Sequence, residues 1–151
     1  MTVNPIREGY HSITPSLMLR DAARAIDFYR DVLGAVEVSR FDMPDGRVGH
    51  AELRIGDSNF TLSDEFPEMG YVGPATRGGT TVMLQLYVAD CDAVFHRAVA
   101  AGSKVMKDLA DQFYGDRSGS IEDPFGHWWT ISTHIEDVSE AEMIRRASSM
   151  G

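Results

Sequence analysis

Two ionisable side chains at strand spacing give the first chemical pattern in the chain. His50 and Glu52 belong to the alternating segment 50–55, and residues i and i+2 of a strand project from the same face. The pair has the composition of an acid–base couple, or of two of the three ligands of a metal site. A cross-strand ion pair, with Arg54 as a further partner, explains the same residues without chemistry, and both interpretations stay open.

A loop in the second half carries a cation beside two aromatic rings. Residues 113–117 are Phe-Tyr-Gly-Asp-Arg. Phe113 and Tyr114 are suited to close over an apolar ligand, and the planar guanidinium of Arg117 matches a carboxylate, phosphonate or enolate oxygen. The alternative is that Arg117 pairs with Asp116 and only holds the loop. Arg117 therefore joins His50 and Glu52 as a catalytic candidate, with no role assigned.

A hairpin at 119–133 must position the most aromatic part of the chain. Residues 123–126, Asp-Pro-Phe-Gly, fit a type I β-turn, because Asp accepts a local hydrogen bond, Pro fixes φ and Gly occupies the fourth position. Trp129 and Ile131 then face one way, whereas Trp128 and Thr130 face the other. The prediction is a strand pair with one apolar face and one face of aromatic and hydrogen-bonding groups.

The two halves of the chain show the same order of predicted elements. In the first half we expect a strand at 13–20, a helix from the cap Asp21 to Gly34, and strands at 36–41, 50–55 and 59–63. In the second half we expect a strand at 80–88, a helix capped by Asp90 or Asp92 and ended by Gly102, a strand at 103–109 and the hairpin. A twice-repeated β-α-β-β-β unit indicates an α+β fold of paired modules.

The repeat sets the expected organisation of the chain. A lead-in spans 1–12, the first βαβββ module 13–66, a linker 67–79, the second module 80–134 and a C-terminal tail 135–151. Pro, Gly and acidic residues without a period characterise the linker, and Phe66, Met69 and Tyr71 in and beside it are candidates for a lid. In the tail, Ser139 is a candidate cap for a short helix.

Several separated blocks of the sequence resemble the vicinal oxygen chelate superfamily, which includes glyoxalases, bleomycin-resistance proteins and extradiol dioxygenases. The blocks are residues 19–34 (LRDAARAIDFYRDVLG), 50–57 (HAELRIGD), 115–117 (GDR) and 122–127 (EDPFGH). An aromatic-Gly-Asp-Arg loop is similar to the PhnB-like branch. The resemblance implies tandem βαβββ modules that form a curved mixed sheet around a cavity, commonly in a homodimer.

The same resemblance locates four positions at which metal-dependent members carry ligands. They fall on Thr14, Thr61, Met83 and Thr130 in this chain. Hydroxyl and thioether groups are poor ligands for a divalent ion that prefers imidazole or carboxylate. We therefore expect no metal and no other cofactor; the alternative is a divalent metal in a non-standard site.

Strand alternation indicates what occupies the cavity instead. Ten apolar strand residues are expected to pack beneath the helices: Leu17, Leu19, Leu53, Ile55, Phe60, Leu62, Leu84, Leu86, Trp129 and Ile131. The opposite face then carries hydroxyl, amide, thioether and aromatic groups. Such a surface suits a planar or amphipathic organic ligand; a solvated outer face is the alternative. The expected ligand-binding residues are Thr14, Thr61, Met83, Gln85, Tyr87, Phe113, Tyr114, Arg117, Trp128 and Thr130.

Composition and charge restrict the partners. The chain has 151 residues, of which 43% are hydrophobic, and a formal net charge of -9. This charge argues against nucleic acid or an anionic membrane as a partner. A single cysteine, Cys91, permits no intramolecular disulfide, and the N-terminus lacks a signal-peptide pattern. We therefore expect a cytoplasmic protein that binds a small molecule, and the family resemblance implies that it forms a homodimer.

The residues support two functions from different classes, a binding protein and an enzyme. The first is a small-molecule-binding protein, similar to the bleomycin-resistance type, that sequesters a planar or antibiotic-like compound without metal. The second is a lyase, isomerase or dioxygenase that uses an unrecognised metal site, or His50, Glu52 and Arg117 as acid–base and oxyanion-stabilising groups. The missing ligands favour the first function.

Overall fold

The computed structural model describes residues 2–150. The chain divides into two compact units, Met1–Thr80 and Thr81–Gly151. Met1 and Gly151, at the outer ends of the predicted lead-in and tail, lie outside the described residues.

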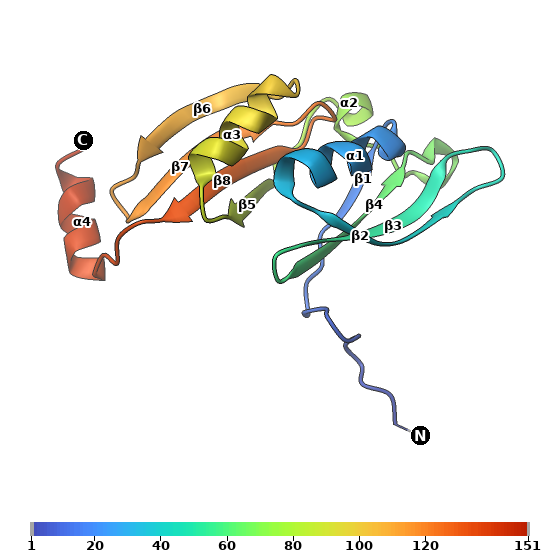
Figure 1. Cartoon of the computed structure of the whole chain (residues 1–151), viewed down its shortest axis with the longest axis horizontal. Helices are drawn as coiled ribbons and strands as arrows, with labels where there is room; N and C mark the ends of the chain where they lie inside the picture. The colour runs from blue at the N-terminus through green and yellow to red at the C-terminus, as the bar shows by residue number, and fades with distance from the viewer. Residues whose placement is uncertain (1, 151) are drawn as a thin grey trace. The chain divides into compact units, whose positions relative to one another are not determined.

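The first unit is a four-stranded mixed sheet with one helix on one face (Figure 1). Its strand order is β1-β4-β3-β2, with β1 parallel to β4 and the other neighbours antiparallel. The elements are β1 (Ser16–Leu19), α1 (Ala22–Leu33), β2 (Val36–Asp42), β3 (Val48–Ile55) and β4 (Ser58–Asp64).

The second unit repeats this topology, with the strand order β5-β8-β7-β6 and β5 parallel to β8. Its elements are β5 (Met83–Tyr87), α3 (Cys91–Ala100), β6 (Lys104–Asp111), β7 (Asp116–Glu122), β8 (Trp128–His134) and the terminal helix α4 (Glu140–Ser148). The predicted α+β fold with two β-α-β-β-β units is confirmed.

Each unit places its core between the helix and one face of the sheet. Seven of the ten residues expected there from alternation are buried: Leu17, Leu19, Leu53, Phe60, Leu62, Trp129 and Ile131. Ile55, Leu84 and Leu86 are only half-buried. The period of two therefore assigns the faces of both sheets correctly.

The first helix begins differently from the prediction. Asp21 occupies the cap position, but its backbone is left-handed at φ 61° and its side chain makes no capping hydrogen bond. The orphan N–H of Ala22 donates instead to Asp64 Oδ1 at 2.9 Å, and Asp64 Oδ2 accepts from the Val48 N–H at 2.7 Å. A residue 42 positions further along the chain thus caps the helix.

The turn of the second hairpin follows the prediction closely. The Gly126 N–H donates to the Asp123 carbonyl at 3.0 Å, which closes the turn. Asp123 Oδ1 accepts from the Phe125 and His127 N–H groups, and its Oδ2 accepts from the Trp129 indole at 2.9 Å. One carboxylate therefore fixes both the turn and the orientation of a core tryptophan.

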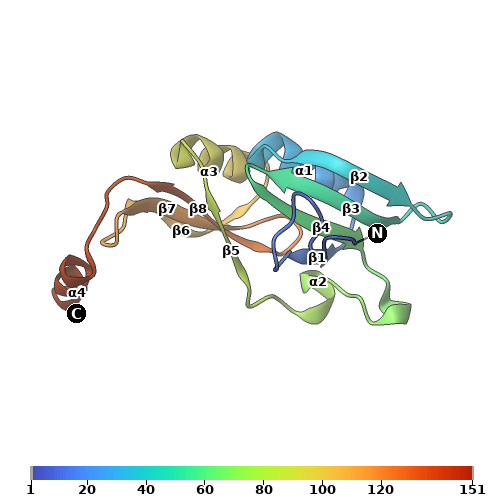
Figure 2. The ribbon, with the colours of Figure 1, turned by 90° about the horizontal axis from the view of Figure 1, so that it is seen from below.

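The last part of the first unit contains structure that the sequence pattern did not show. Within the predicted linker lie the 3-10 helix η1 (Pro67–Met69) and the four-residue helix α2 (Pro74–Arg77). Figure 2 shows this segment beside β1. Both helices begin with Pro and end at a left-handed glycine, Gly70 or Gly78, so turn residues rather than hydrophobic periodicity define them.

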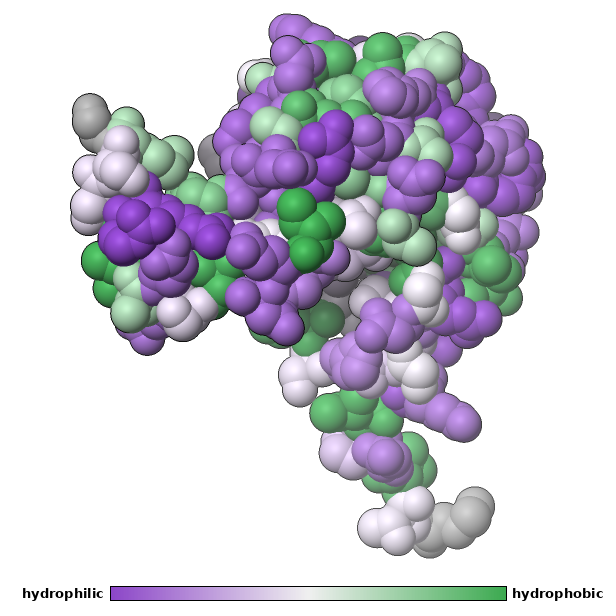
Figure 3. Space-filling view, turned by 60° about the vertical axis from the view of Figure 1, so that its left-hand side comes forward, coloured by the Kyte–Doolittle hydropathy of each residue, from purple (hydrophilic) through white to green (hydrophobic). Residues whose placement is uncertain are grey.

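The surface is mostly polar, with apolar side chains scattered among charged ones on the face that Figure 3 shows. No helix among residues 2–150 is long and apolar enough to cross a bilayer.

Substituting Asp64→Ala is expected to lower the free energy of unfolding by about 2 kcal/mol, because it leaves the N–H groups of Ala22 and Val48 without their acceptor. Asp21→Gly is the matched control. It should be neutral or slightly stabilising, since glycine adopts φ 61° without the steric cost of a side chain. Urea denaturation monitored by circular dichroism measures both changes; equal losses in the two variants would contradict this account of the cap.

Candidate functional site

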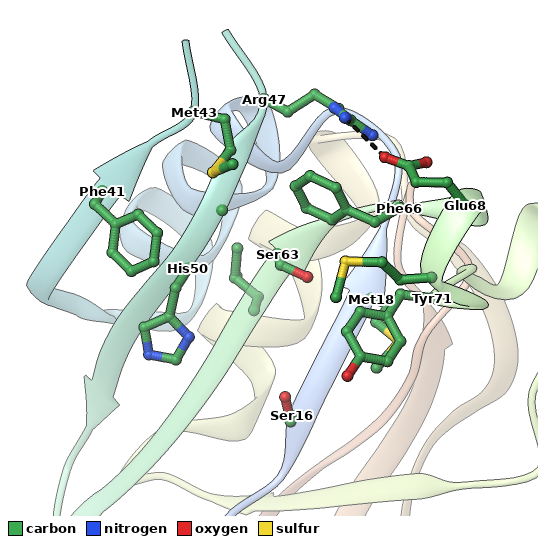
Figure 4. A pocket seen from close by; sticks show the side chains of 13 residues that line it. Ser16, Met18, Phe41, Met43, Arg47, His50, Ser63, Phe66, Glu68 and Tyr71 are labelled. Atoms are coloured by element: carbon green, nitrogen blue, oxygen red, sulfur yellow. Dashed lines mark hydrogen bonds and ion pairs between the residues drawn. The ribbon is translucent and has the colours of Figure 1, made fainter. Parts of the chain in front are cut away.

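A pocket of about 470 Å³ lies in the first unit, on the polar face of its sheet (Figure 4). Strands β1, β3 and β4 supply the floor, β2 and its turn supply one wall, and residues 66–71 supply the other. The lining residues are Ser16, Met18, Phe41, Met43, Arg47, Gly49, His50, Leu62, Ser63, Phe66, Glu68, Met69 and Tyr71.

Thioethers and aromatic rings dominate the lining. Met18, Met43 and Met69 come from three different segments, and the rings of Phe41, Phe66 and Tyr71 share the lining with them. Methionine side chains are flexible and polarisable, so they adapt to ligands of differing outline and make favourable contacts with aromatic rings. A cavity of this volume and lining has the character of a small-molecule site.

The wall at 66–71 is fixed in place by backbone and carboxylate contacts. Phe66 and Tyr71 exchange two backbone hydrogen bonds, of 2.7 and 3.0 Å. Glu65 accepts from the Gly73 N–H at 2.7 Å and from Arg20 Nε at 2.9 Å. The three residues considered for a lid, Phe66, Met69 and Tyr71, all line the pocket.

Arg47 organises the outer rim. Its guanidinium lies 4.1 Å over the Phe66 ring and contacts Asp45 at 2.8 Å and Glu68 at 2.9 Å. These hydrogen bonds raise the pKa of Arg47 and lower those of Asp45 and Glu68. Two carboxylates and one guanidinium leave the rim with one excess negative charge.

Three polar side chains reach into the pocket from the sheet. Ser16 accepts a hydrogen bond from Thr61 Oγ1 at 2.9 Å, so its own proton is available to a ligand. Ser63 donates to the Asp64 carbonyl at 3.0 Å, so its oxygen remains an acceptor. The His50 imidazole is stacked on Phe41 with a centroid distance of 5.9 Å, and Figure 4 shows it at the floor.

Glu52, the predicted partner of His50, is committed to a distant arginine. Arg7 Nη1 donates to Glu52 Oε1 at 2.8 Å, whereas His50 Nε2 lies 3.5 Å from the same oxygen. The hydrogen bond from Arg7 is the main reason that the pKa of Glu52 falls to about 2. A carboxylate this acidic is a weak base, so the contact favours the ion-pair interpretation, with Arg7 in place of Arg54.

The contact with Glu52 belongs to a larger attachment of the N-terminal segment. Asn59 Nδ2 donates to the Gly9 carbonyl at 2.8 Å, and Arg7 lies 4.7 Å over the Tyr10 ring. Both Glu52 and Asn59 are buried as a result. Figure 2 shows the segment crossing the sheet on the side opposite α1. The predicted lead-in therefore covers part of the polar face and leaves the pocket beside it.

Eight of the ten expected ligand-binding residues lie in the second unit, and the pocket does not include them. Met83, Gln85 and Tyr87 pair in register with Trp128, Thr130 and Ser132, so they share one sheet face. Thr130 is hydrogen-bonded to Ser120 at 2.9 Å, and the Trp128 indole donates to Glu122 at 3.1 Å. Thr14 and Thr61, in the first unit, do not line the pocket either. A binding role for all of these residues stays a prediction.

The aromatic loop of the second unit is tied to its own neighbours. Arg117 binds Asp92 at 2.7 Å and Asp111 at 3.2 Å, and the hydrogen bond to Asp92 is the main cause of its raised pKa. Its partners are thus carboxylates other than the adjacent Asp116. Phe113 and Tyr114 pack edge to face at 5.2 Å.

A hydrogen-bonded chain centred on Asp116 was not foreseen from the sequence. The buried carboxylate accepts from the Tyr87 hydroxyl at 2.7 Å and lies 2.8 Å from His134 Nδ1. His134 Nε2 lies 2.7 Å from Asp137, and the contacts with Asp116 and Asp137 raise its pKa. The sequence gives no local signal for this chain of hydrogen bonds, because Tyr87, Asp116 and His134 come from three different strands, β5, β7 and β8.

The residues at the family's metal positions do not fit a divalent ion. Thr61 donates its hydroxyl proton to Ser16, and Thr130 is bonded to Ser120. Met83 offers only a thioether, and threonine hydroxyls are weak ligands in their neutral form. Among residues 2–150, no three His, Cys, Asp or Glu side chains are grouped so that they could hold a metal ion.

Comparison with known sequences gives one family match and several relatives. The model of the Glyoxalase/Bleomycin resistance protein/Dioxygenase superfamily matches residues 10–131. An uncharacterised protein of Mycobacterium bovis is 42% identical over 143 residues, which cover 93% of this chain and 94% of that protein. Protein YjdN of Escherichia coli is 28% identical over 94 residues, which cover 62% of this chain and 61% of that protein.

Solved structures share the fold. TioX from Micromonospora sp. ML1 is 25% identical, with a TM-score of 0.63 over 85% of this chain and 100% of that one. Protein PA1353 from Pseudomonas aeruginosa is 22% identical, with a TM-score of 0.70 over 83% of this chain and 99% of that one. The PhnB protein from Bacillus cereus is 20% identical, with a TM-score of 0.66 over 82% of this chain and 99% of that one.

The Arg7–Glu52 contact predicts a pH dependence of stability. The pKa of Glu52 is about 2 in the folded chain, against 4.5 for an unperturbed glutamate. Its contribution to the free energy of unfolding is therefore present above pH 4.5 and is lost as the pH falls toward 2. Glu52→Gln should therefore flatten the decline in unfolding free energy over this window, and Arg7→Ala should flatten it to a similar extent. Urea denaturation at pH 6, 4 and 3 measures the effect; Arg24→Ala, an exposed helical arginine, is the control and should leave the slope unchanged.

Proposed function

Because the chain belongs to the Glyoxalase/Bleomycin resistance protein/Dioxygenase superfamily, we propose that it binds a small organic molecule in the pocket of its first unit, without a metal ion. Proteins with the fold of this superfamily have several different activities, so the function must be assigned from the residues of the site. The proposal is a binding protein of the bleomycin-resistance-like kind, which holds its ligand and does not transform it.

The observation that carries the proposal is the pocket lining. Three thioethers and three aromatic rings enclose about 470 Å³ above a floor that offers one hydroxyl donor and few acceptors. Each charged rim residue has an oppositely charged partner within 3 Å, so none of them needs a ligand charge as a partner. Apolar contact area with a few fixed polar groups is the usual basis of small-molecule binding.

The chemistry of the donor groups supports binding over catalysis. Glu52 is held by Arg7, and Arg117 by Asp92 and Asp111. Hydroxyl and thioether groups stand at the family's metal positions. An enzymatic function, as a lyase, isomerase or dioxygenase, would have to use His50 with a ligand or a metal in a non-standard site. We therefore rank it second.

The branch of the superfamily and the cellular compartment are also proposals. The loop Tyr114-Gly115-Asp116-Arg117 supports a PhnB-like branch, and the single, buried Cys91 is in keeping with a cytoplasmic protein.

A homodimer, common in this superfamily, predicts a solution mass of twice the 16.7 kDa of one chain. Light scattering after size exclusion checks this mass; a single-chain value would refute the dimer.

Titration with Nile red, a neutral solvatochromic dye, tests ligand binding directly. The wild-type chain is expected to bind about one dye per chain with a blue-shifted emission, because the dye enters an apolar cavity. Ser63→Trp places a large ring in the floor of the pocket and should weaken binding by about tenfold or more. Dye that does not bind to the wild type would contradict the proposal.

A matched variant in the second unit separates the two sheet faces. Thr130→Trp makes the same enlargement at the corresponding polar face and should leave dye affinity within about twofold of the wild type. The opposite result, with Thr130→Trp abolishing binding and Ser63→Trp leaving it intact, would move the site to the residues expected from the sequence. Circular dichroism confirms that both variants are folded.

A further inference from the structure

The polar groups of the pocket specify more than an apolar ligand. We propose that the pocket selects a flat aromatic molecule that is neutral or cationic and carries a hydrogen-bond donor, such as a phenolic hydroxyl, which donates to His50 Nδ1. This inference rests on the proposed function, because it names the ligand class of the same pocket. It follows from the tautomer of His50, the polar groups that line the pocket, and the charge of the rim.

The tautomer of His50 follows from its neighbour. Glu52 is ionised because Arg7 donates to it, and an ionised carboxylate only accepts hydrogen bonds. Nε2 of His50, 3.5 Å from Glu52 Oε1, is therefore the nitrogen that carries the proton in the neutral imidazole. Nδ1 is left as an acceptor. In Figure 4 one ring nitrogen of His50 faces the side of the pocket on which Ser63 and Ser16 lie.

The remaining polar groups of the lining include both donors and acceptors. The proton of Ser63 is used by the Asp64 carbonyl, so its oxygen accepts. Ser16 offers a proton, since it accepts from Thr61, and the Tyr71 hydroxyl can donate or accept. A ligand that only accepts hydrogen bonds leaves His50 Nδ1 unsatisfied when it displaces water, and an unsatisfied buried acceptor is costly. A ligand that donates satisfies it.

The charge around the pocket disfavours an anion. Arg47 is the only guanidinium among the lining residues, and both Asp45 and Glu68 hold it within 3 Å. The pair of carboxylates leaves one excess negative charge at the rim. An anionic ligand would have to displace one of these carboxylates from Arg47, whereas a neutral or cationic one meets no such barrier.

The stacking geometry favours a flat ligand. Phe41 and His50 are stacked with an angle of 28° between their rings. Arg47 is stacked on Phe66, which presents a second planar surface across the pocket. Two planar surfaces and adaptable methionines between them are suited to an aromatic ring system, which gains contact area at little entropic cost.

A matched set of naphthalenes tests the ligand class by displacement of Nile red from the full chain at pH 7.5. 2-Naphthol carries the donor, 2-methoxynaphthalene replaces its proton by a methyl group, and 2-naphthoate carries a negative charge. We expect 2-naphthol to bind about tenfold more tightly than 2-methoxynaphthalene, which lacks the hydrogen bond to His50. We expect 2-naphthoate to bind most weakly. Equal affinities for the first two, or tightest binding of 2-naphthoate, would overturn the inference.

Two variants identify the groups responsible. His50→Phe keeps a ring for stacking on Phe41 and removes the acceptor, so it should bring the ratio of the 2-naphthol and 2-methoxynaphthalene affinities close to one. Glu68→Gln removes one rim carboxylate and should strengthen 2-naphthoate several-fold. A preference for 2-naphthol that survives in His50→Phe would overturn the assignment to Nδ1, and the Glu68→Gln arm tests the charge selection even if His50→Phe does not fold.

The outcomes distinguish this inference from the proposed function. If Nile red binds and Ser63→Trp blocks it, the pocket is a ligand site whatever the order of the naphthalenes. If neither the dye nor any naphthalene binds, the proposed function fails and the ligand class fails with it.

Discussion

Two adjacent carboxylates at the end of β4 fix the architecture of the first unit. Asp64 faces the helix side of the sheet, where it binds the first N–H of α1 and the N–H of Val48. Glu65 faces the other side, where it binds the Gly73 N–H and Arg20. Because successive residues of an extended chain point in opposite directions, this one dipeptide holds the helix on one face of the sheet and the pocket wall on the other.

The charged side chains beside the pocket of the first unit are paired with one another, so none of them needs a ligand as a partner. Arg7 neutralises Glu52, and Arg47 is shared by Asp45 and Glu68. Paired charges at a surface contribute little to stability. The result is a cavity with an apolar lining, paired charges at its rim and few polar atoms at its floor.

The sequence predicted the fold because its signals are local. Alternation assigned Leu53, Leu62 and Ile131 to the core, and Asp123 and Gly126 marked the hairpin turn. The N–H of Glu142 donates to Ser139 as expected at the start of α4. Each of these depends on residues within a few positions of one another, which is the range over which periodicity and turn chemistry carry information.

The pocket was only partly predictable because its contacts join residues far apart in the sequence. Phe66, Met69 and Tyr71 were recognised as candidates from composition, but η1 and its two-residue bridge have no periodic signature. Arg7 binds Glu52 across 45 positions, and Asp64 caps a helix across 42. Charged side chains have many possible partners in a chain of this composition, and only the three-dimensional structure selects one.

The two units place different side chains at the same position of the same fold. Met18 pairs with Ser63 on β1 and β4, and Tyr87 pairs with Ser132 at the corresponding place on β5 and β8. In the first unit both side chains line the pocket. In the second, the Tyr87 hydroxyl reaches Asp116 on β7 at 2.7 Å, so its ring must cross β8, and Ser132 is fully buried.

The two positions differ in what the side chain can bond to. The Tyr87 hydroxyl is satisfied by a carboxylate two strands away, so this side chain lies across the polar face of the second sheet. Met18 carries a thioether and has no hydroxyl proton to donate to a carboxylate, and it lines the pocket of the first unit. Repetition of the unit therefore gives two polar faces of the same topology, and the side chain on the edge strand is one residue at which they differ.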